Sequence, residues 1–273
     1  MTVSLDAALS GMLEHQRQIE LISNNMANIN TAGYKRVKVH FQALLDTAEI
    51  LQAVQGNLPV QDATTAGGVQ TTSIDRAFAQ GTLQPSESDL DFAIAGPGLF
   101  KVRLEDGSAA YTRDGAMRLD ASRHLVLADG TPLEPAITLP EVFTRVAVDT
   151  DGHVIATRPM TADELAAREP DNAATTIAED LGAITLARFA NPELLAGIGN
   201  NLYLPTDGSG PAIDGTPGEP GFGTVSNARL EASNVDIGQE MTSLIVASRS
   251  FQMNLQAYRT ISEMLRQANE LPA

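Results

Sequence analysis

Two short segments contain the residue types of a ligand site, and both are better explained as turns. Gly96-Pro97-Gly98 follows an apolar run, as a phosphate-binding loop does, but the third glycine is missing. The residues after it, 100–104, alternate like a strand rather than opening a helix. Asp149-Thr150-Asp151-Gly152-His153 has the acids of a calcium loop, but no glycine at the sixth position and no glutamate at the twelfth. We predict a turn in each place.

Catalytic chemistry has equally little support. The four histidines, His15, His40, His124 and His153, are scattered without the paired spacing of metal ligands. A Ser/His/Asp triad meets only in space, but the Gly-x-Ser-x-Gly elbow is absent from the sequence. The chain contains no cysteine, which excludes disulfides, thiolate catalysis and cysteine-based zinc sites. We therefore predict no enzyme activity, no metal and no cofactor. A β-domain hydrolase is a remote alternative.

The most regular pattern lies near the C-terminus, in residues 231–271. Apolar residues there recur in alternating steps of four and three, interrupted by two serines. The positions are Ile237, Met241, Leu244, Ser248, Phe251, Leu255, Tyr258, Ser262 and Leu265. This heptad spacing predicts a helix that packs along a partner helix, because each apolar side chain gains about 1.5–3 kcal/mol on full burial.

Residues 3–29 supply a candidate partner. Their apolar stripe, mostly in steps of three or four, consists of Leu5, Leu9, Met12, Ile19, Ile22, Met26 and Ile29. The run ends in an asparagine-rich segment that reaches Gly33, and such residues favour helix ends because they tolerate the left-handed conformation.

The region between the helices has a different pattern. Asp-Gly pairs at 106–107, 114–115, 129–130, 151–152, 207–208 and 214–215 predict hairpin turns. We predict strands at residues 92–95, 100–104, 117–119, 125–127, 146–149 and 184–188, and a short helical segment at 161–168. The fold class is therefore α+β, with long N- and C-terminal helices paired as a coiled coil and an antiparallel β-rich central domain.

We divide the chain into five predicted parts. They are an N-terminal helical part (1–45), a bridging segment (46–84), a β-rich domain (85–204), a Gly/Pro-rich connector (205–229) and a C-terminal helix (230–273). Residues 42–84 are poor in aromatic residues and have low hydrophobicity, so we expect them to become ordered only in an assembly.

The charge pattern restricts the partners. The chain of 273 residues has a net charge of −16, and 43% of its residues are hydrophobic. Both ends are nearly neutral, so most of the acidic excess lies between residues 51 and 228. Nucleic acid and anionic membranes need clustered Lys and Arg, so neither is an expected partner. The sequence also shows no membrane-spanning run and no typical signal peptide.

The two helical stripes allow two interpretations. They pair with each other within a monomer, or they also pack against neighbouring chains. Apolar residues outside the heptad positions, such as Ile245, Val246, Ile261 and Ala268, favour assembly, because exposed apolar surface marks interfaces. A head-to-tail contact that does not close would give a helical tube.

The terminal segments resemble the signatures of the bacterial flagellar rod and hook proteins. The N-terminal match spans residues 24–36, and the C-terminal match spans residues 230–236 and Glu240-Met241. Residues 92–100, 111–115 and 199–203 are similar to family segments as well, with Tyr34 where phenylalanine is usual. The chain length and Thr216-Pro217-Gly218 are most similar to distal rod members, with proximal rod members as the alternative.

This resemblance implies a structural rod subunit that forms a hollow helical tube, transmits torque and contains the export channel. It implies export without a cleaved signal peptide into the basal body in the cell envelope. Implied partners are further copies of the chain, other rod and hook proteins, the flagellar export apparatus and outer ring proteins, but no nucleic acid or small-molecule substrate. A secreted coiled-coil/β binding module is the other alternative. The expected interface residues are Leu9, Met12, Ile19, Ile22, Met26, Asn28, Asn30, Gly33, Tyr34, Asn234, Val235, Met241, Leu244, Phe251, Leu255, Tyr258 and Leu265.

Overall fold

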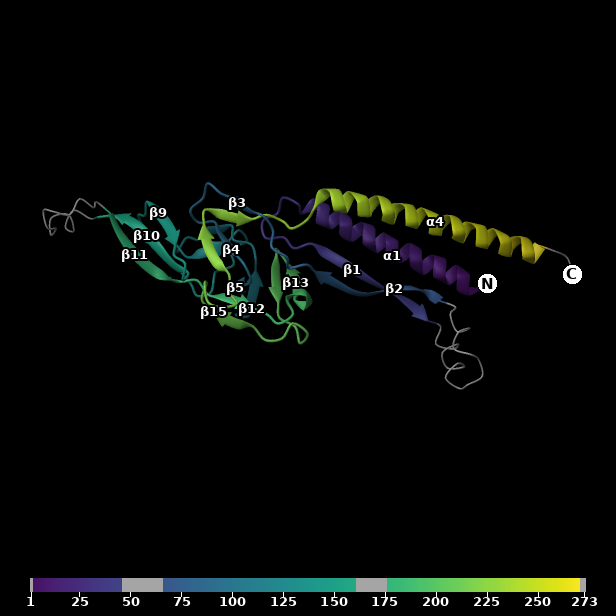
Figure 1. Ribbon diagram of the computed structural model, residues 1–273, viewed down its shortest axis with the longest axis horizontal. Helices are drawn as coiled ribbons and strands as arrows, with labels where there is room; N and C mark the ends of the chain where they lie inside the picture. The colour runs from purple at the N-terminus through teal and green to yellow at the C-terminus, as the bar shows by residue number, and fades with distance from the viewer. Residues whose placement is uncertain (1, 46–65, 161–175, 271–273) are drawn as a thin grey trace. The chain divides into compact units, whose positions relative to one another are not determined.

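The computed structural model describes residues 2–45, 66–160 and 176–270 of the chain (Figure 1). By their internal contacts, the residues form two units. The helical unit consists of Met1–Asn28, Val37–Ala77 and Val235–Ala273, and the β-rich unit consists of Ile29–Arg36 and Phe78–Asn234. Terminal helices and a central antiparallel β region confirm the predicted α+β class. Most of the predicted bridge and the predicted helical segment at 161–168 lie outside the described residues.

Two long helices, α1 (Thr2–Ala27) and α4 (Ile237–Glu270), pack side by side in the helical unit (Figure 1). A Cβ atom on Gly11 would lie 2.7 Å from Nδ2 of Asn254, so this glycine permits a close approach of the two helices. The predicted pairing of the terminal helices is therefore confirmed. Among the described residues, no helix is both long and apolar enough to cross a membrane.

The C-terminal helix starts later than we predicted. Residues 231–236 are not helical, and Glu231 ends a short strand. Asp236 determines the start, because its Oδ1 accepts the backbone N–H of Gln239 at 2.9 Å. A carboxylate that accepts a hydrogen bond from the first turn is a strong N-cap. The heptad positions themselves begin at Ile237, the first residue of α4, so the error lies in the predicted boundary at residue 230 and not in the heptad pattern.

A hairpin of β1 (Val37–Leu45) and β2 (Ala66–Arg76) completes the described part of the helical unit. The N–H of Val69 donates to Oγ of Ser10 in α1 at 3.2 Å, and a Cβ on Gly68 would collide with the same hydroxyl group. The sequence did not predict β2, because few of its residues are apolar and its stability comes from pairing with β1 and packing on α1.

The β-rich unit contains fifteen strands and one short 3-10 helix in its described part. The strands are β3 (Leu83–Pro85), β4 (Phe92–Ala95), β5 (Leu99–Arg103), β6 (Ala109–Thr112), β7 (Met117–Leu119), β8 (Leu125–Leu127), β9 (Arg145–Val148), β10 (His153–Pro159), β11 (Thr176–Ala183), β12 (Leu186–Arg188), β13 (Ala196–Gly199), β14 (Leu202–Leu204), β15 (Ile213–Gly215), β16 (Thr224–Asn227) and β17 (Arg229–Glu231), and the 3-10 helix is η1 (Pro192–Leu194). The six predicted strands correspond to β4, β5, β7, β8, β9 and β12.

The largest sheet has the strand order β13-β14-β6-β5-β12-β15, and every pair is antiparallel. Neighbouring residues along its strands enter different clusters, because side chains alternate between the faces of a sheet. Phe100, Leu186 and Leu202 belong to the main core, whereas Leu99, Ala187 and Tyr203 belong to a second cluster with Tyr111, Phe189 and Leu195. Both faces of the sheet are therefore covered.

The smaller sheets are β11-β10-β9, β16-β4, β17-β3 and β7-β8. The Asp-Gly pairs were predicted to form hairpin turns, and only some of them do. Gly107, Gly130 and Gly152 adopt positive φ in tight turns. Gly215 instead lies in β15, and Gly115 is needed for another reason, since a Cβ there would lie 1.6 Å from the Phe92 carbonyl oxygen.

Candidate assembly site

Three charged residues from the matched segments form a buried cluster in the β-rich unit. Nζ of Lys35 donates to Oε1 of Glu231 at 2.5 Å, and a guanidinium nitrogen of Arg113 lies 3.2 Å from Oε2 of the same carboxylate. The side chains of Lys35 and Glu231 are completely buried, and that of Arg113 is 5% exposed. A single carboxylate therefore serves two buried cations, which come from distant parts of the sequence.

Backbone groups satisfy most of the remaining polar atoms of this cluster, although Nε of Arg113 is buried without a hydrogen-bond partner among the described residues. Nζ of Lys35 also donates to the Ala79 carbonyl oxygen at 2.8 Å, and Oε1 of Glu231 accepts the N–H of Gly81 at 2.7 Å. Arg113 donates to the carbonyl oxygens of Ile94 and Gly96, at 3.2 and 2.6 Å. These bonds make desolvation of the charges tolerable, since buried charges need both pairing and hydrogen bonds.

Desolvation and the Glu231 charge shift the pKa values of the two cations of this cluster in opposite directions. Burial lowers the pKa of the Lys35 ammonium group, and the Glu231 carboxylate partly offsets that effect. Burial likewise lowers the pKa of Arg113, opposed by Glu231. Beside the cluster, burial raises the pKa of Asp114, although its hydrogen bond from the Ala116 N–H acts in the other direction. The single carboxylate thus offsets one of the two positive charges, and the site holds all three charged side chains away from solvent.

Asparagines fix the backbone next to the charges. Within the β-rich unit, Oδ1 of Asn234 accepts the N–H of Arg36 at 2.8 Å, while Nδ2 donates to Ala79 at 2.9 Å. Within the helical unit, Asn25 exchanges two bonds of 2.9 Å with the backbone of Val37. Its Nδ2 also lies 3.4 Å from Oε2 of the buried Glu240 in α4. Residues of the N- and C-terminal signatures therefore meet in both units.

The backbone conformation and the surroundings of Gly33 explain why the N-terminal signature has a glycine at this position. Its φ is +67°, and a Cβ there would lie 2.5 Å from the backbone nitrogen of Asp114. The N–H of Gly33 donates to the Glu231 carbonyl oxygen at 2.8 Å. Any larger residue would therefore be strained and would collide with the backbone of the β-rich unit.

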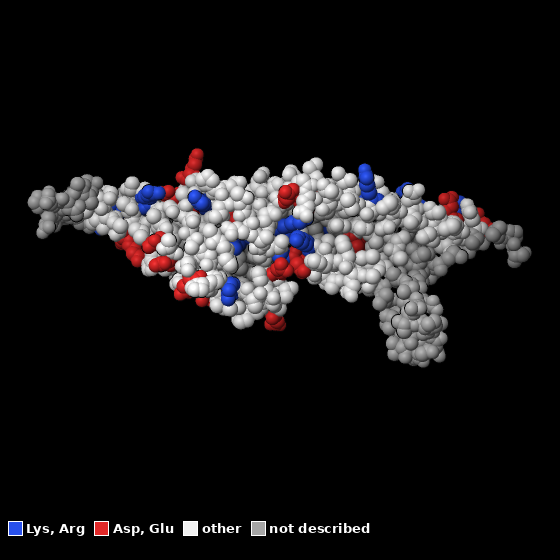
Figure 2. Space-filling model, viewed as in Figure 1, with Lys and Arg blue, Asp and Glu red and all other residues white. Residues whose placement is uncertain are grey.

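The helical unit exposes most of the large apolar side chains that face solvent. Ten of the fourteen such residues in the described part of the chain belong to it. They are Leu9, Leu13, Phe41, Ile74, Ile237, Met241, Ile245, Val246, Met253 and Met264. On the face shown in Figure 2, much of this unit is correspondingly uncharged, while acidic groups are scattered over the β-rich unit. A concentration of exposed apolar side chains on one unit is typical of a protein interface.

The expected interface residues fall into three groups by exposure. Met12, Ile22, Gly33, Tyr34 and Val235 are buried. Half-buried positions are Ile19, Met26, Asn28, Asn234, Leu244, Phe251, Leu255, Tyr258 and Leu265, while Leu9, Asn30 and Met241 are exposed.

The sequence patterns missed several residues of the buried charged cluster and its surroundings, and several exposed apolar residues of the helices. Lys35, Glu231 and Glu240 lie inside the matched signatures, and a charged residue within an otherwise apolar or amide-rich motif was the available signal. The exposed Leu13, Met253 and Met264 lie outside the heptad positions, where helical spacing could have grouped them. Ile245 and Val246 are exposed as expected, whereas Ile261 is half-buried, and the side chains of Leu5 and Ala268 lie outside the described residues.

The candidate ligand segments are turns, as predicted. Gly96-Pro97-Gly98 joins β4 to β5, with φ of +116° at Gly96 and +136° at Gly98. Asp149 and Gly152 close the turn between β9 and β10 through a backbone bond of 3.0 Å. Within the described part of the chain, no three His, Asp or Glu side chains are grouped for a metal ion.

Three family matches cover both termini and the centre of the chain. Residues 5–35 match the family described as "Flagella basal body rod protein", and residues 93–156 match "Flagellar hook protein FlgE/F/G D1 domain". Residues 226–271 match "Flagellar basal body rod FlgEFG protein C-terminal". These segments include Lys35, Arg113 and Glu231 respectively, so the buried cluster joins all three.

Full-length relatives agree with these matches. The chain is 34% identical to the flagellar basal-body rod protein FlgG of Borreliella burgdorferi, with 99% of each chain covered. It is 37% identical to FlgG of Caulobacter vibrioides and 32% identical to FlgG of Bacillus subtilis, with 98% of each chain covered in both comparisons. The predicted distal rod subunit is therefore confirmed. The family is structural rather than enzymatic, and membership implies assembly with other rod or hook proteins. The chain belongs to the FlgG family of flagellar basal-body rod proteins and is a structural subunit of the distal rod.

Proposed function

We propose that the chain polymerises into a hollow helical tube in which the helical units of neighbouring copies pack against one another. The tube transmits motor torque and contains the export channel. The observation that carries this proposal is the concentration of exposed apolar side chains on the helical unit. A monomer gains nothing from that exposure, whereas an assembly buries it at about 25 cal/mol per Å².

The exposed apolar residues of α4 form two stripes in addition to the side that packs on α1. Ile237, Met241 and Ile245 follow one another in steps of four, so they lie along one side of the helix. Val246, Met253 and Met264 are separated by seven and eleven residues, close to whole numbers of turns, and form a second stripe. Two separate stripes suit a helix that contacts more than one neighbouring copy.

This arrangement divides the expected interface residues by role. Met12, Ile22 and Val235 are buried in the single chain, so we assign them to the stability of the subunit. Leu9 and Met241 are 43% and 51% exposed, and we assign them to contacts between copies. The five predicted parts of the chain remain a working division. Residues 66–76 and 83–85 of the predicted 42–84 segment already form strands β2 and β3 in the single chain, so they do not need an assembly to become ordered. We also propose that the flagellar export apparatus exports the chain without a cleaved signal peptide, and that outer ring proteins surround the polymer.

Met253→Glu tests the proposed packing of α4. Met253 is 65% exposed, so a carboxylate at this position leaves the isolated chain folded, but it would place an unpaired charge inside the polymer. We expect loss of rods in isolated basal bodies and loss of motility, with an unchanged circular dichroism spectrum of the purified chain. The matched control is Gln252→Glu, at an exposed polar neighbour in the same helix. Normal rods with Met253→Glu would disprove the proposal.

A further inference from the structure

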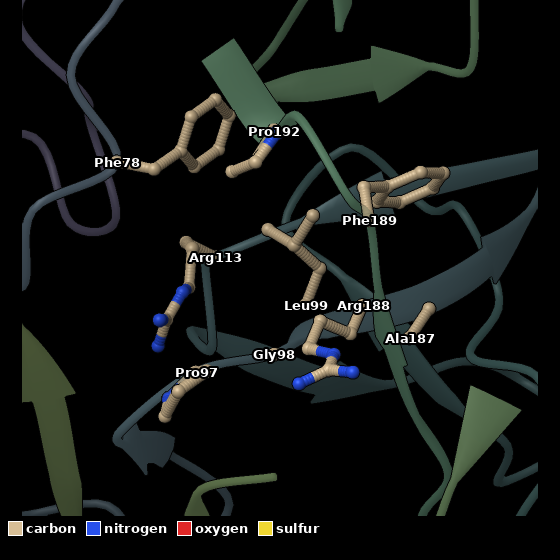
Figure 3. Close-up of a pocket in the computed structure, with 9 residues that line it drawn as sticks. All are labelled: Phe78, Pro97, Gly98, Leu99, Arg113, Ala187, Arg188, Phe189 and Pro192. Atoms are coloured by element: carbon tan, nitrogen blue, oxygen red, sulfur yellow. The ribbon is translucent and has the colours of Figure 1, made fainter. Parts of the chain in front are cut away.

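A small apolar pocket opens on the second cluster of the β-rich unit. It has a volume of about 180 Å³, and Figure 3 shows Phe78, Pro192 and Phe189 arranged around Leu99. Pockets for drug-sized ligands and cofactors measure about 300–1,000 Å³, so this one suits a single protruding side chain. Phe78 is held by an edge-to-face contact with Tyr203, and Phe189 by one with Tyr111, so the walls are preformed.

Two arginines line the pocket, and they differ in whether a carboxylate pairs with them. Arg113 is buried and pairs at 3.2 Å with Glu231, the carboxylate that it shares with Lys35. Arg188 is exposed and rests over the Phe222 ring, with 5.8 Å between its guanidinium carbon and the ring centre. No carboxylate in the described part of the chain lies within 4.0 Å of it as an ion-pair partner. The pocket therefore presents an apolar hollow next to one uncompensated positive charge.

A matching occupant would have an exposed apolar side chain next to an available carboxylate. In the helical unit, the acids beside exposed apolar residues already have partners. Glu14 binds the Thr71 hydroxyl group, Asp75 pairs with His40, Asp236 caps α4 and Glu263 pairs with Arg266. In the β-rich unit, Asp214 beside Ile213 pairs with Lys101 at 3.0 Å.

Two candidates remain among the described residues, and their positions separate them. Glu193-Leu194 belongs to η1, which begins with the pocket residue Pro192, so it forms part of the rim. Glu141-Val142 lies elsewhere in the chain, between β8 and β9. Val142 is 60% exposed and the Glu141 side chain is 89% exposed, with Arg123 only at 4.0 Å.

We propose that Val142 of one copy inserts into the Phe78–Leu99–Phe189–Pro192 pocket of a second copy, and that Glu141 pairs there with Arg188. Val142 and the pocket are different surfaces of the same chain, so the contact is head-to-tail, and in the proposed polymer each copy makes it with two neighbours. This inference rests on the proposed polymer and adds a specific contact between β-rich units. A small apolar anchor beside a charged rim is a usual arrangement for an interface that depends on few residues.

Disulfide crosslinking can test this contact directly, because the chain has no cysteine of its own. We would express Val142→Cys/Pro192→Cys as the full chain in cells, isolate basal bodies and oxidise them. The expected result on a non-reducing gel is a ladder of dimers and larger multimers, since each copy can link to two neighbours. Either single variant alone should give no ladder. Intact rods without crosslinked species would overturn the inference.

Charge reversal gives a second test that does not depend on cysteine geometry. Arg188→Glu or Glu141→Arg alone should reduce the yield of rods at least tenfold, and Arg188→Glu/Glu141→Arg together should restore it. Arg118→Glu, at an exposed position of β7, is the control and should leave the yield unchanged. Equal defects in the single and double variants would refute the pairing. If Met253→Glu abolishes rods while these variants assemble normally, the proposed function holds and this contact fails. If Met253→Glu also forms normal rods, the proposed function fails.

Discussion

At the scale of single residues, the Lys35–Arg113–Glu231 cluster is the most demanding feature of the β-rich unit. Two cations share one carboxylate in a site that excludes solvent. Removing the anion would leave two buried like charges without a partner, and removing one cation would leave a neutral pair. The energetic cost therefore depends on which member is lost.

Glu231→Gln is expected to lower the free energy of unfolding of the β-rich unit by about 3–5 kcal/mol. The substitution removes the only anion of the cluster, so both buried cations lose their ion-pair partner. Urea denaturation followed by tyrosine fluorescence measures this loss. Glu134→Gln is the matched control, since Glu134 also lies between a lysine and an arginine, Lys101 and Arg103, but near the surface. We expect a loss of about 0–1 kcal/mol for the control. The double variant Glu231→Gln/Lys35→Met should recover part of the loss, and a purely additive effect would contradict the pairing.

Asp114 makes stability depend on pH. Burial raises its pKa above the ordinary value of 3.8, so the unfolded chain loses this proton first as the pH increases. The contribution of Asp114 to the free energy of unfolding therefore falls as the pH rises from about 3.8 through the folded pKa. The loss of stability caused by burying the ionised Asp114 carboxylate is fully present at neutral pH and absent in acid.

Asp114→Asn removes this titration but keeps an oxygen that accepts the Ala116 N–H. We expect a higher melting temperature than that of the unmodified chain at pH 7, and a difference that disappears near pH 3. Asp106→Asn is a suitable comparison, because hydrogen bonds lower the pKa of that exposed carboxyl group and the substitution should not stabilise the chain at neutral pH. A constant gain at all pH values would show that charge is not the cause.

At the scale of elements, the segment 29–36 after α1 is anchored in the β-rich unit rather than in the helical unit. Gly33 allows the backbone to turn there with positive φ and to approach residues 113 and 114 closely. The segment would otherwise be a short polar loop with few apolar contacts. Its position therefore depends on Gly33, on the buried Lys35 and on two amides, those of Asn234 and of Asn201, which donates to the Ala32 carbonyl oxygen at 3.1 Å.

Gly33→Ala should destabilise the β-rich unit by about 2 kcal/mol or more, since the backbone strain of a positive φ adds to a backbone collision. Gly107→Ala is the control, because Gly107 also has positive φ, at +84°, but a Cβ there meets open space. That variant should lose only about 1 kcal/mol. Thermal denaturation of both purified chains gives the comparison, and equal losses would mean that the close approach to Asp114 has no energetic effect.

The helices show where a periodic pattern is informative and where it is not. Leu244, Phe251, Leu255, Tyr258 and Leu265 are half-buried at the predicted heptad positions, but Ile237 and Met241 are 53% and 51% exposed. A helix with 3.6 residues per turn drifts by roughly 20° per heptad against a 3.5-residue repeat, so one stripe does not remain on the partner along the whole helix. The first turns of α4 consequently turn those side chains towards solvent.

At the scale of the whole molecule, the segment that follows α1 and the segment that precedes α4 both belong to the β-rich unit. Ile29–Arg36 and the strand that ends at Glu231 belong to the β-rich unit. A fragment of residues 29–234 therefore keeps the buried cluster and lacks both long helices. We expect it to be monomeric in sedimentation and to melt cooperatively, as followed by circular dichroism.

A shorter fragment, residues 37–234, is the matched control for this prediction. It loses Lys35, the Gly33–Glu231 backbone bond and the Arg36–Asn234 bond. It should melt at a clearly lower temperature than fragment 29–234, although the two differ by only a few residues. Equal melting temperatures would show that residues 29–36 do not stabilise the β-rich unit.

The sequence by itself determined the α+β class, the two apolar terminal helices, six of the strands and the family. Those features depend on local periodicity, turn chemistry and short motifs, which neighbouring residues in the chain encode. Strands such as β2, β6 and β10 were not predicted, because their positions depend on pairing partners more than on their own pattern. Only the tertiary structure brought Lys35 to Glu231 and formed the Phe78–Leu99–Phe189–Pro192 pocket. Contacts between residues distant in the sequence leave no periodic signal, and their free energy appears only when the folded chain removes them from water.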